Sequence, residues 1–285
     1  MLNRRTELFS FLFLSDGKNN FGKIKNMIDL INGDCLEIMK QIPNESIDMI
    51  LCDLPYGTTA CKWDEVLPFN KLWEQYERVI KPNGAIVLTA SQPFTSALVM
   101  SNPKLFKYEW IWEKSKASNF LLAKKQPLKA HENILVFGKG SVVYYPQKTE
   151  GKPFNKGNRK HDNGIATEVY NKIQNAGIEI VNEDGMRNPR SVQYFITGES
   201  EGKLHPTQKP TWLFEYLIKT YTNENETVLD NCMGSGTTPI ACLNTNRKCI
   251  GIELEEKYFN LAFERVEKKR KEKDLQAETL FGDGM

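Results

Sequence analysis

The stretch TVLDNCMGSGTT, residues 227–238, indicates the fold of this chain. A short β-branched run ends in Asp230, a turn with Gly234 and Gly236 follows, and Thr237 opens a helical pattern. Paired glycines let the backbone approach a ligand, and the start of a helix favours negative charge. The next apolar run ends in Glu253, where a carboxylate can bind both hydroxyls of a ribose. The stretch therefore predicts a strand, turn and helix that bind a nucleoside-containing cofactor.

The turn differs from the fingerprint of nicotinamide-dependent oxidoreductases. The third glycine of that fingerprint is replaced by Pro239, and the GK[ST] sequence of a P-loop is absent. A carboxylate at Asp230 would repel a pyrophosphate but attract an ammonium group, such as that of a methionine-derived cofactor. An oxidoreductase is therefore the less favoured interpretation.

The rest of the chain alternates apolar runs with amphipathic segments. Such a pattern is typical of a parallel α/β sheet covered by helices on both faces. The predicted strands are residues 27–31, 47–52, 84–90, 108–114, 132–139, 227–230 and 249–255. The predicted helices are residues 35–42, 69–80, 211–221, 237–245 and 257–273.

The composition indicates the cellular compartment of the protein more clearly than its function. The chain has 285 residues with a net charge of +2, which by itself does not indicate a nucleic-acid partner. Its six cysteines include no CxxC pair, so we expect a reduced cytoplasmic protein without a structural metal. Arg4-Arg5 and the following apolar run resemble a short signal sequence but lack a cleavage site. We expect residues 1–26 to be a dispensable extension, with Met27 as an alternative start.

The tetrapeptide DLPY, Asp53–Tyr56, is an unusual way to leave a buried strand, although a proline-containing turn is the plain structural interpretation. DLPY resembles the [D/N/S]PP[Y/F] motif of amino-methyltransferases that act on DNA. NCMGSGTT resembles their cofactor motif, and HPTQKP, residues 205–210, is similar to the short motif that precedes the cofactor strand in permuted members. In this order, the three motifs resemble the β-type, circularly permuted DNA amino-methyltransferases of the N6-adenine/N4-cytosine family.

The resemblance implies a Rossmann-like methyltransferase fold, with a mostly parallel seven-stranded sheet and helices on both faces. It divides the chain into a catalytic half at 27–139, a target-recognition region at 140–204 and a cofactor-binding half at 205–285. The implied cofactor is S-adenosyl-L-methionine and the implied partner is double-stranded DNA. Members of the family occur beside restriction endonucleases, in phages and as solitary regulators, which implies a prokaryotic or phage-encoded cytoplasmic protein, monomeric or homodimeric.

The resemblance also implies roles for the DLPY residues. Asp53 would supply a carboxylate oxygen and Leu54 its main-chain carbonyl, and together they would hold the hydrogens of the target amine. Pro55 would fix the backbone, and Tyr56 would stack on a base flipped out of the duplex. Leu54 departs from the usual proline, but its carbonyl is unaffected by the side chain. The nearby Lys62-Trp63-Asp64 could line the same site.

The implied cofactor-binding set lies in three parts of the chain. Asp34 resembles a position that contacts the cofactor's adenine ring, and it is equally well explained as a helix N-cap. Thr207 and Lys209 would bind the cofactor carboxylate, and His205 would orient a neighbour. His131 and His161 are expected to have ordinary structural roles. The complete set is Asp34, His205, Thr207, Lys209, Asp230, Gly234, Gly236, Thr237 and Glu253.

The candidate DNA-binding segment is basic and rich in aromatic residues. From Lys114 to Lys160 the sequence has eleven lysine or arginine residues and two glutamates. Such a segment suits phosphate neutralisation, although a solvated surface is the plainer explanation. We expect phosphate contacts from Lys114, Lys116, Lys124 and Lys125, and contacts to guanine edges from Arg159, Arg187 and Arg190.

Together these patterns predict a site-specific, S-adenosylmethionine-dependent DNA adenine-N6 methyltransferase. The aspartate at position 53 favours adenine by preference, and a cytosine-N4 methyltransferase is the main alternative. A further alternative is a nucleoside-binding or DNA-binding relative that has lost catalysis through Leu54.

Overall fold

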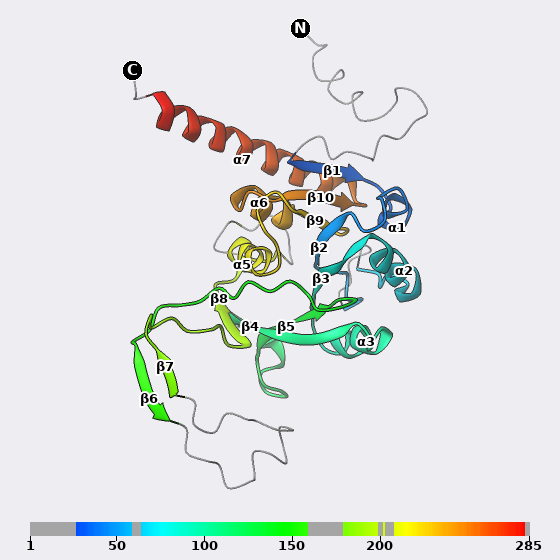
Figure 1. Ribbon diagram of the computed structural model, residues 1–285. Coiled ribbons are helices and arrows are strands. Elements are labelled where there is room, and N and C mark those ends of the chain that lie inside the picture. Colours follow the sequence, from blue (N-terminus) through cyan, green and yellow to red (C-terminus); the bar gives the residue numbers. More distant parts are fainter. Residues whose placement is uncertain (1–26, 59–63, 159–178, 199–201, 203–207, 283–285) are drawn as a thin grey trace.

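The computed structural model describes residues 27–58, 64–158, 179–198, 202 and 208–282 (Figure 1). The strands are β1 Ile28–Asn32, β2 Ile47–Cys52, β3 Ile80–Ala90, β4 Phe106–Ser118, β5 Lys129–Phe137, β6 Phe154–Asn158, β7 Glu179–Asn182, β8 Val192–Phe195, β9 Thr227–Asp230 and β10 Lys248–Glu253. The helices are α1 Cys35–Met39, α2 Phe69–Val79, α3 Phe94–Ser101, the 3-10 turn η1 Phe120–Leu122, α5 Thr211–Tyr221, α6 Thr237–Asn244 and α7 Glu256–Gly282.

One mostly parallel sheet organises the molecule. Its strand order is β1-β10-β9-β2-β3-β5-β4-β8. The five neighbouring strands β1, β10, β9, β2 and β3 run parallel to one another. Strand β5 is antiparallel to both β3 and β4, and β8 runs parallel to β4. The predicted α/β class and the seven predicted strands are confirmed, and β8 extends the sheet to eight. This eighth strand comes from the region at 140–204, where the sequence shows no sustained period.

Helices cover both faces of the sheet, as the near-continuous apolar strands require. On one face α1, α2 and α3 pack into a core cluster with residues of β2 and β3, including the fully buried Tyr76. On the other face α5, α6 and α7 pack over a second cluster that contains Trp110 and Tyr221. Figure 1 shows these two groups of helices on opposite sides of the strands.

The two predicted halves of the methyltransferase domain share this sheet. Strands β9 and β10, from the C-terminal half, lie between β1 and β2, from the N-terminal half. The carboxyl ends of β1, β10, β9 and β2 therefore meet at one edge, which is where ligands bind in open α/β sheets. Asp34, Glu253, Asp230 and Asp53 all lie at or just after these strand ends.

Several local predictions need correction. Helix α3 was not predicted, and α7 continues to Gly282, beyond the predicted end. Helix α2 ends at Val79, within one residue of its predicted end, but β3 begins at Ile80 and already includes the segment Lys81–Gly84. Ile80 pairs with Ile47 of β2, the register then shifts, and Ala85 pairs with Met49, so this segment forms an irregularity within a continuous strand.

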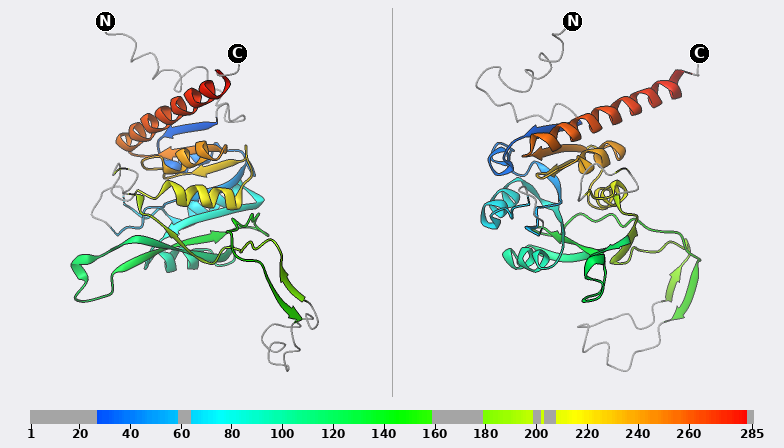
Figure 2. Two further views of the ribbon diagram at one scale, coloured as in Figure 1. Left: turned by 90° about the vertical axis from the view of Figure 1, so that its left-hand side faces the viewer. Right: turned by 180° about the vertical axis from the view of Figure 1, so that it is seen from behind.

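The region at 140–204 also contains regular structure, because β6 and β7 form a separate two-stranded antiparallel sheet. Figure 2 shows this small sheet projecting away from the main body of the protein. Within the part of the chain that the structure describes, no helix has the length and apolar character needed to cross a membrane.

Candidate active site

A cavity of about 950 Å³ lies at the carboxyl edge of the central strands. It brings together most of the predicted catalytic and cofactor-binding residues that the structure describes. From the predicted sets, the cavity lining includes Asp34, Asp53, Leu54, Pro55, Tyr56, Lys114, Lys116, Lys209, Asp230, Gly234, Thr237 and Glu253. His205, Thr207, Lys62 and Trp63 lie outside the described residues.

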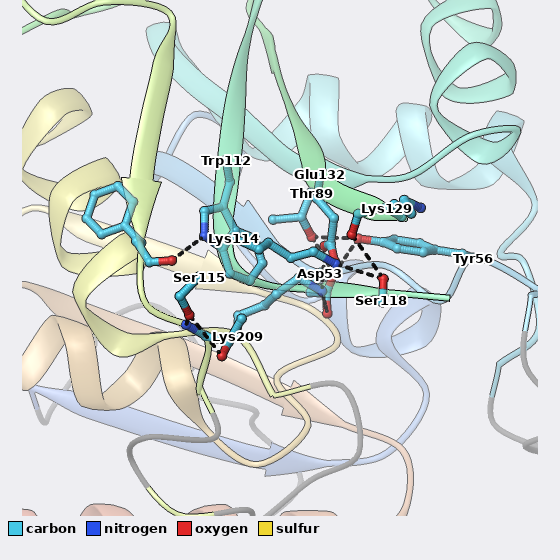
Figure 3. Close-up of polar contacts among 12 residues, drawn as sticks. Asp53, Tyr56, Thr89, Trp112, Lys114, Ser115, Ser118, Lys129, Glu132 and Lys209 are labelled. Atoms are coloured by element: carbon cyan, nitrogen blue, oxygen red, sulfur yellow. Dashed lines mark hydrogen bonds and ion pairs between the residues drawn. The ribbon is translucent and has the colours of Figure 1, made fainter. Parts of the chain in front are cut away.

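Asp53 is the centre of the polar contacts in the cavity (Figure 3). Its Oδ1 accepts hydrogen bonds from the Tyr56 hydroxyl, at 2.7 Å, and from the Thr89 hydroxyl. Its Oδ2 accepts one from Lys209 Nζ, also at 2.7 Å. Burial and the nearby Asp53 charge raise the pKa of Tyr56 well above its usual range, so the Tyr56 hydroxyl stays protonated and donates. The Asp53 carboxylate is thereby held as an oriented acceptor.

Lys209 and Lys114 make ion pairs that the sequence analysis did not predict. The Lys209 ammonium lies between Asp53 and Glu132, 3.5 Å from Glu132 Oε2, and its predicted contact with a cofactor carboxylate stays a prediction. Burial opposes its charge, but the two carboxylates outweigh burial and hold the pKa of Lys209 well above its usual range. Lys114, predicted to contact a DNA phosphate, is 9% exposed and its Nζ lies 3.2 Å from Glu132 Oε1. Both lysines belong to a buried network of charges.

Thr89 and Glu132 are site residues that the sequence analysis missed. Thr89 is the one polar residue in the apolar run at 85–90, and that interruption is a usable signal. Glu132 begins the apolar run of β5, and its role depends on the antiparallel pairing that places β5 beside β3 and β4. Burial would raise the pKa of Glu132, but Lys209 and Lys114 together lower it, so its carboxylate is ionised.

The remaining DLPY residues are fixed by packing. Leu54 is buried, and its side chain belongs to the core cluster on the α1–α3 face. The Tyr56 ring stacks on Phe94, with centroids 5.1 Å apart, and Lys209 Nζ lies 5.5 Å from its centroid. Asp64 holds the following turn, because its two carboxylate oxygens accept hydrogen bonds from Gly57 N and Thr58 N at 2.9 Å each.

Asp230 stabilises the glycine turn through hydrogen bonds. It is 2% exposed, its Oδ1 accepts from Cys232 N at 3.1 Å, and its Oδ2 accepts from the Thr238 hydroxyl. Burial raises the pKa of Asp230 to about 7. Each Asp230 oxygen accepts one hydrogen bond that fixes the turn, and the predicted attraction to a ligand ammonium stays a prediction.

The turn itself suits a nucleoside-containing ligand. Glu253 accepts from Gly234 N at 2.8 Å and from Glu255 N at 2.9 Å, one bond to each oxygen, which leaves lone pairs for ribose hydroxyls. Burial raises the pKa of Glu253. Gly234 has φ +52°, and a Cβ there would meet no atom within 4 Å, so open space faces its backbone. At Gly236, φ is +82° and a Cβ would lie 3.0 Å from Ala262 Cβ, so this glycine permits close packing of α7.

Two further cofactor residues occupy defined positions. Asp34 caps α1, because its Oδ1 accepts from Leu36 N at 2.8 Å, and the N-cap interpretation is confirmed. Its place in the cavity lining also keeps the predicted contact with an adenine ring open to test. The Thr237 hydroxyl donates to the Lys209 carbonyl at 3.4 Å, which joins the glycine turn to the segment that carries Lys209.

The predicted DNA-binding residues are placed in two groups. Lys116, Lys124 and Lys125 are exposed on the β4–β5 hairpin, and Arg190 is exposed before β8. Arg187 makes contacts within its own region, and its predicted contact with a guanine edge stays a prediction. Its guanidinium donates to Asn182 Oδ1 at 2.7 Å and to the carbonyls of Gly185 and Lys152, and it covers the Phe154 ring at 4.9 Å. Arg159 lies outside the described residues.

Comparison with known proteins agrees with this geometry. A family model described as DNA methylase matches residues 47–264. The chain is 29% identical over 257 residues to the Type II methyltransferase M.HpaI of Haemophilus parainfluenzae, a match that covers 84% of this chain and 74% of that protein. It is also 29% identical over 257 residues to the DNA adenine methyltransferase YhdJ of Escherichia coli (strain K12), with 84% and 82% covered.

A solved structure supports the same assignment. The M1.HpyAVI–SAM complex superposes with a TM-score of 0.57 and 27% identity, covering 84% of this chain and 99% of that one. The predicted family and fold are therefore confirmed. Because the family model spans most of the chain, the protein belongs to the N6/N4 DNA methylase family.

Proposed function

We propose that this protein transfers a methyl group from S-adenosyl-L-methionine to the N6 amine of adenine in double-stranded DNA. The observation that carries the proposal is the oriented Asp53 carboxylate in one cavity with the glycine turn and Glu253. The aspartate at position 53 and the similarity to a DNA adenine methyltransferase favour adenine. Cytosine N4 is the second candidate target, because both amines are exocyclic and need the same acceptors.

The residues of the turn would hold the cofactor. Glu253 would accept hydrogen bonds from the ribose hydroxyls, and Asp34 would lie beside the adenine ring. The open space at Gly234 would admit the ligand next to the backbone. His205 and Thr207 stay predictions for the part of the cofactor nearest the methyl group. S-Adenosyl-L-methionine supplies an electrophilic methyl group when bound.

The DLPY residues would prepare the amine for attack. An exocyclic amine is a weak nucleophile because its lone pair is delocalised into the ring. Asp53 Oδ1 already accepts two hydrogen bonds, whereas Oδ2 accepts one and retains a lone pair for the target amine. The Leu54 carbonyl would accept the second amine hydrogen, and Pro55 would keep the two acceptors converging. Alignment of the amine with the methyl group would then provide most of the rate gain, and the released proton would leave to solvent.

The remaining parts of the chain are assigned by the same proposal. Residues 140–204 would contact the target sequence, residues 27–139 and 205–285 would form the catalytic and cofactor-binding halves, and residues 1–26 would be dispensable. The similarity to proteins named Type II methyltransferases supports a cytoplasmic role beside a cognate restriction endonuclease. Resistance of DNA from expressing cells to a nuclease of the same specificity would test that role.

Methyl transfer from labelled cofactor to mixed-sequence DNA, followed by nucleoside analysis, tests the function. We expect N6-methyladenine, whereas N4-methylcytosine would select the second candidate. Asp53→Ala should abolish transfer and leave cofactor binding largely intact, with Asp64→Ala testing whether loss of a neighbouring carboxylate that holds the turn at Gly57 and Thr58 has a milder effect. Cofactor binding without transfer by the wild-type protein would identify a non-catalytic relative. Undiminished transfer by Asp53→Ala would show that DLPY is not the reaction site.

A further inference from the structure

The β4–β5 hairpin ends in an exposed apolar tip, formed by Phe120, Leu121 and Leu122. These residues are 74%, 85% and 42% exposed. Asn119 precedes them with φ +67°, and they form the 3-10 turn η1. Figure 2 shows the hairpin projecting from the body of the protein. Large apolar side chains this exposed and adjacent are unusual in a folded protein and mark an interaction site.

The apolar tip adjoins the catalytic cavity. Phe120 and Asn119 line the cavity that contains Asp53 and Tyr56. The base of the hairpin is tied to the same charge network, because Lys114 Nζ donates to Ser118 Oγ at 3.2 Å and lies beside Glu132 of the opposite strand. Ser118 Oγ also donates to the Lys129 carbonyl at 3.3 Å, which closes the hairpin below the tip. The position of the tip is therefore fixed relative to the site.

The charges around the tip identify the partner. Lys116, Lys124 and Lys125 are exposed beside it, and the sequence has no aspartate or glutamate between Glu113 and Glu132. Two copies of such a surface would repel each other, whereas a nucleic-acid backbone would neutralise it. A base must leave the duplex to reach the partly buried Asp53 carboxylate, and its departure opens a gap in the base stack. Apolar side chains of other proteins fill such gaps as wedges.

We propose that the apolar tip inserts into the DNA duplex at the position that the target base leaves. Leu121, the most exposed of the three, enters the stack, and Phe120 lies between the stack and the cavity. The three lysines contact the flanking phosphates. This inference rests on the proposed function, and it assigns to the hairpin the stabilisation of the flipped-base state.

Leu121→Ala tests the inference, because Leu121 lies outside the cavity lining and its loss removes no core contact. Leu121→Met is the conservative variant, and Met100→Ala is the control, since Met100 is 72% exposed on α3. The substrates are duplexes that carry the site mapped by sequencing DNA methylated by the wild-type protein. One duplex is fully paired and the other has a mismatch opposite the target base.

On the paired duplex we expect Leu121→Ala to slow single-turnover methyl transfer by about tenfold or more. The reason is that no leucine side chain then fills the gap in the base stack and offsets the free-energy cost of unstacking the target base. The mismatched duplex should restore the rate to within about threefold of wild type, because a mismatched base unstacks at lower cost. Leu121→Met and Met100→Ala should behave as wild type on both duplexes.

Three results would overturn the inference while leaving the proposed function intact. Wild-type rates for Leu121→Ala on both duplexes would show that the tip does not enter the stack. An equal loss on both duplexes would assign the tip to general DNA contact. A change of oligomeric state in Leu121→Ala, with an equal loss on both duplexes, would assign it to a second copy of the chain. Failure of the wild-type protein to methylate any DNA would overturn the proposed function itself.

Discussion

Lys209 lies between two carboxylates, and the substitution Glu132→Gln tests what this arrangement contributes. Lys209 Nζ is 2.7 Å from Asp53 Oδ2 and 3.5 Å from Glu132 Oε2, an oxygen that is buried and makes no hydrogen bond. At an effective dielectric constant of about 20, two charges at 3.5 Å attract each other by about 5 kcal/mol before desolvation is subtracted. The Lys209 and Glu132 side chains are 7% and 16% exposed, so desolvation offsets much of this attraction. We expect Glu132→Gln to lower the free energy of unfolding by about 2–3 kcal/mol.

The same substitution should slow catalysis. Without the Glu132 charge, the Lys209 ammonium is attracted to Asp53 alone and competes with the target amine for Oδ2. We expect single-turnover methyl transfer to slow by about tenfold or more, with unchanged cofactor affinity. Removing the competing ammonium as well, in Glu132→Gln with Lys209→Met, should give faster transfer than Glu132→Gln alone.

A double-mutant cycle separates this interpretation from a general structural defect. The two substitutions should couple by about 1–3 kcal/mol in urea unfolding, because together they remove one positive and one negative charge. Glu113→Gln, an exposed carboxylate on β4, is the matched control and should change neither quantity. If the two effects simply add in both unfolding and transfer, Lys209 does not couple the carboxylates and the reasoning is refuted.

Three further predictions concern single side chains. Leu54→Ala should lower the free energy of unfolding by about 2–3 kcal/mol in urea titrations, because the side chain packs in the core, yet transfer should stay within about threefold of wild type. A complete loss of transfer in a folded Leu54→Ala protein would contradict a role limited to the carbonyl. Thr89→Val removes a donor to Asp53 Oδ1 and should slow single-turnover transfer by about tenfold, and an unchanged rate would show that Asp53 does not need this donor. Burial raises the pKa of Asp230 to about 7, so the folded state binds this proton more tightly than the unfolded state, and stability falls as pH rises from about 4 to about 7, by up to about 4 kcal/mol. In thermal unfolding between about pH 5 and about pH 8, the stability of Asp230→Asn should fall less than that of wild type as the pH rises. An identical fall in stability would show that other groups cause the pH dependence.

The sequence predicted the strands of the central sheet because burial on both faces leaves a clear apolar signature. Runs such as Met49–Cys52 are fully buried, and each predicted strand of the sheet is present. The same rule fails outside the sheet. Strands β6 and β7 have no continuous apolar run, and among the described residues they pair as strands only with each other. Their existence depends on contacts such as those of Arg187, which its sequence position alone does not reveal.

The site shows a similar division between local and long-range information. Gly234 and Glu253 were predicted from a strand, a turn and the end of the next strand, and Asp53 was predicted from the resemblance of DLPY to a methyltransferase motif. The pairing of Lys209 with Asp53 joins residues 156 positions apart, and no periodicity links them. The contacts of Asp230 were missed for a different reason. Its position at a strand end indicates a ligand contact, whereas its burial and its two hydrogen bonds to the turn are visible only in the structure.

Leu54 is the residue at which this chain departs from the family motif, and it also provides a proposed acceptor for the target amine. In sequence it replaces the usual proline of the motif, which suggests a defective site. In the structure it lines the cavity while its side chain packs in the core cluster with residues of α1, α2 and α3. Core packing can therefore fix the backbone at this position, as a proline ring would by restricting φ. Pro55 keeps the next residue rigid, so the acceptor carbonyl is held from both sides. A motif position that must provide only a main-chain oxygen can therefore vary in its side chain, because Pro55 also restricts the backbone beside it.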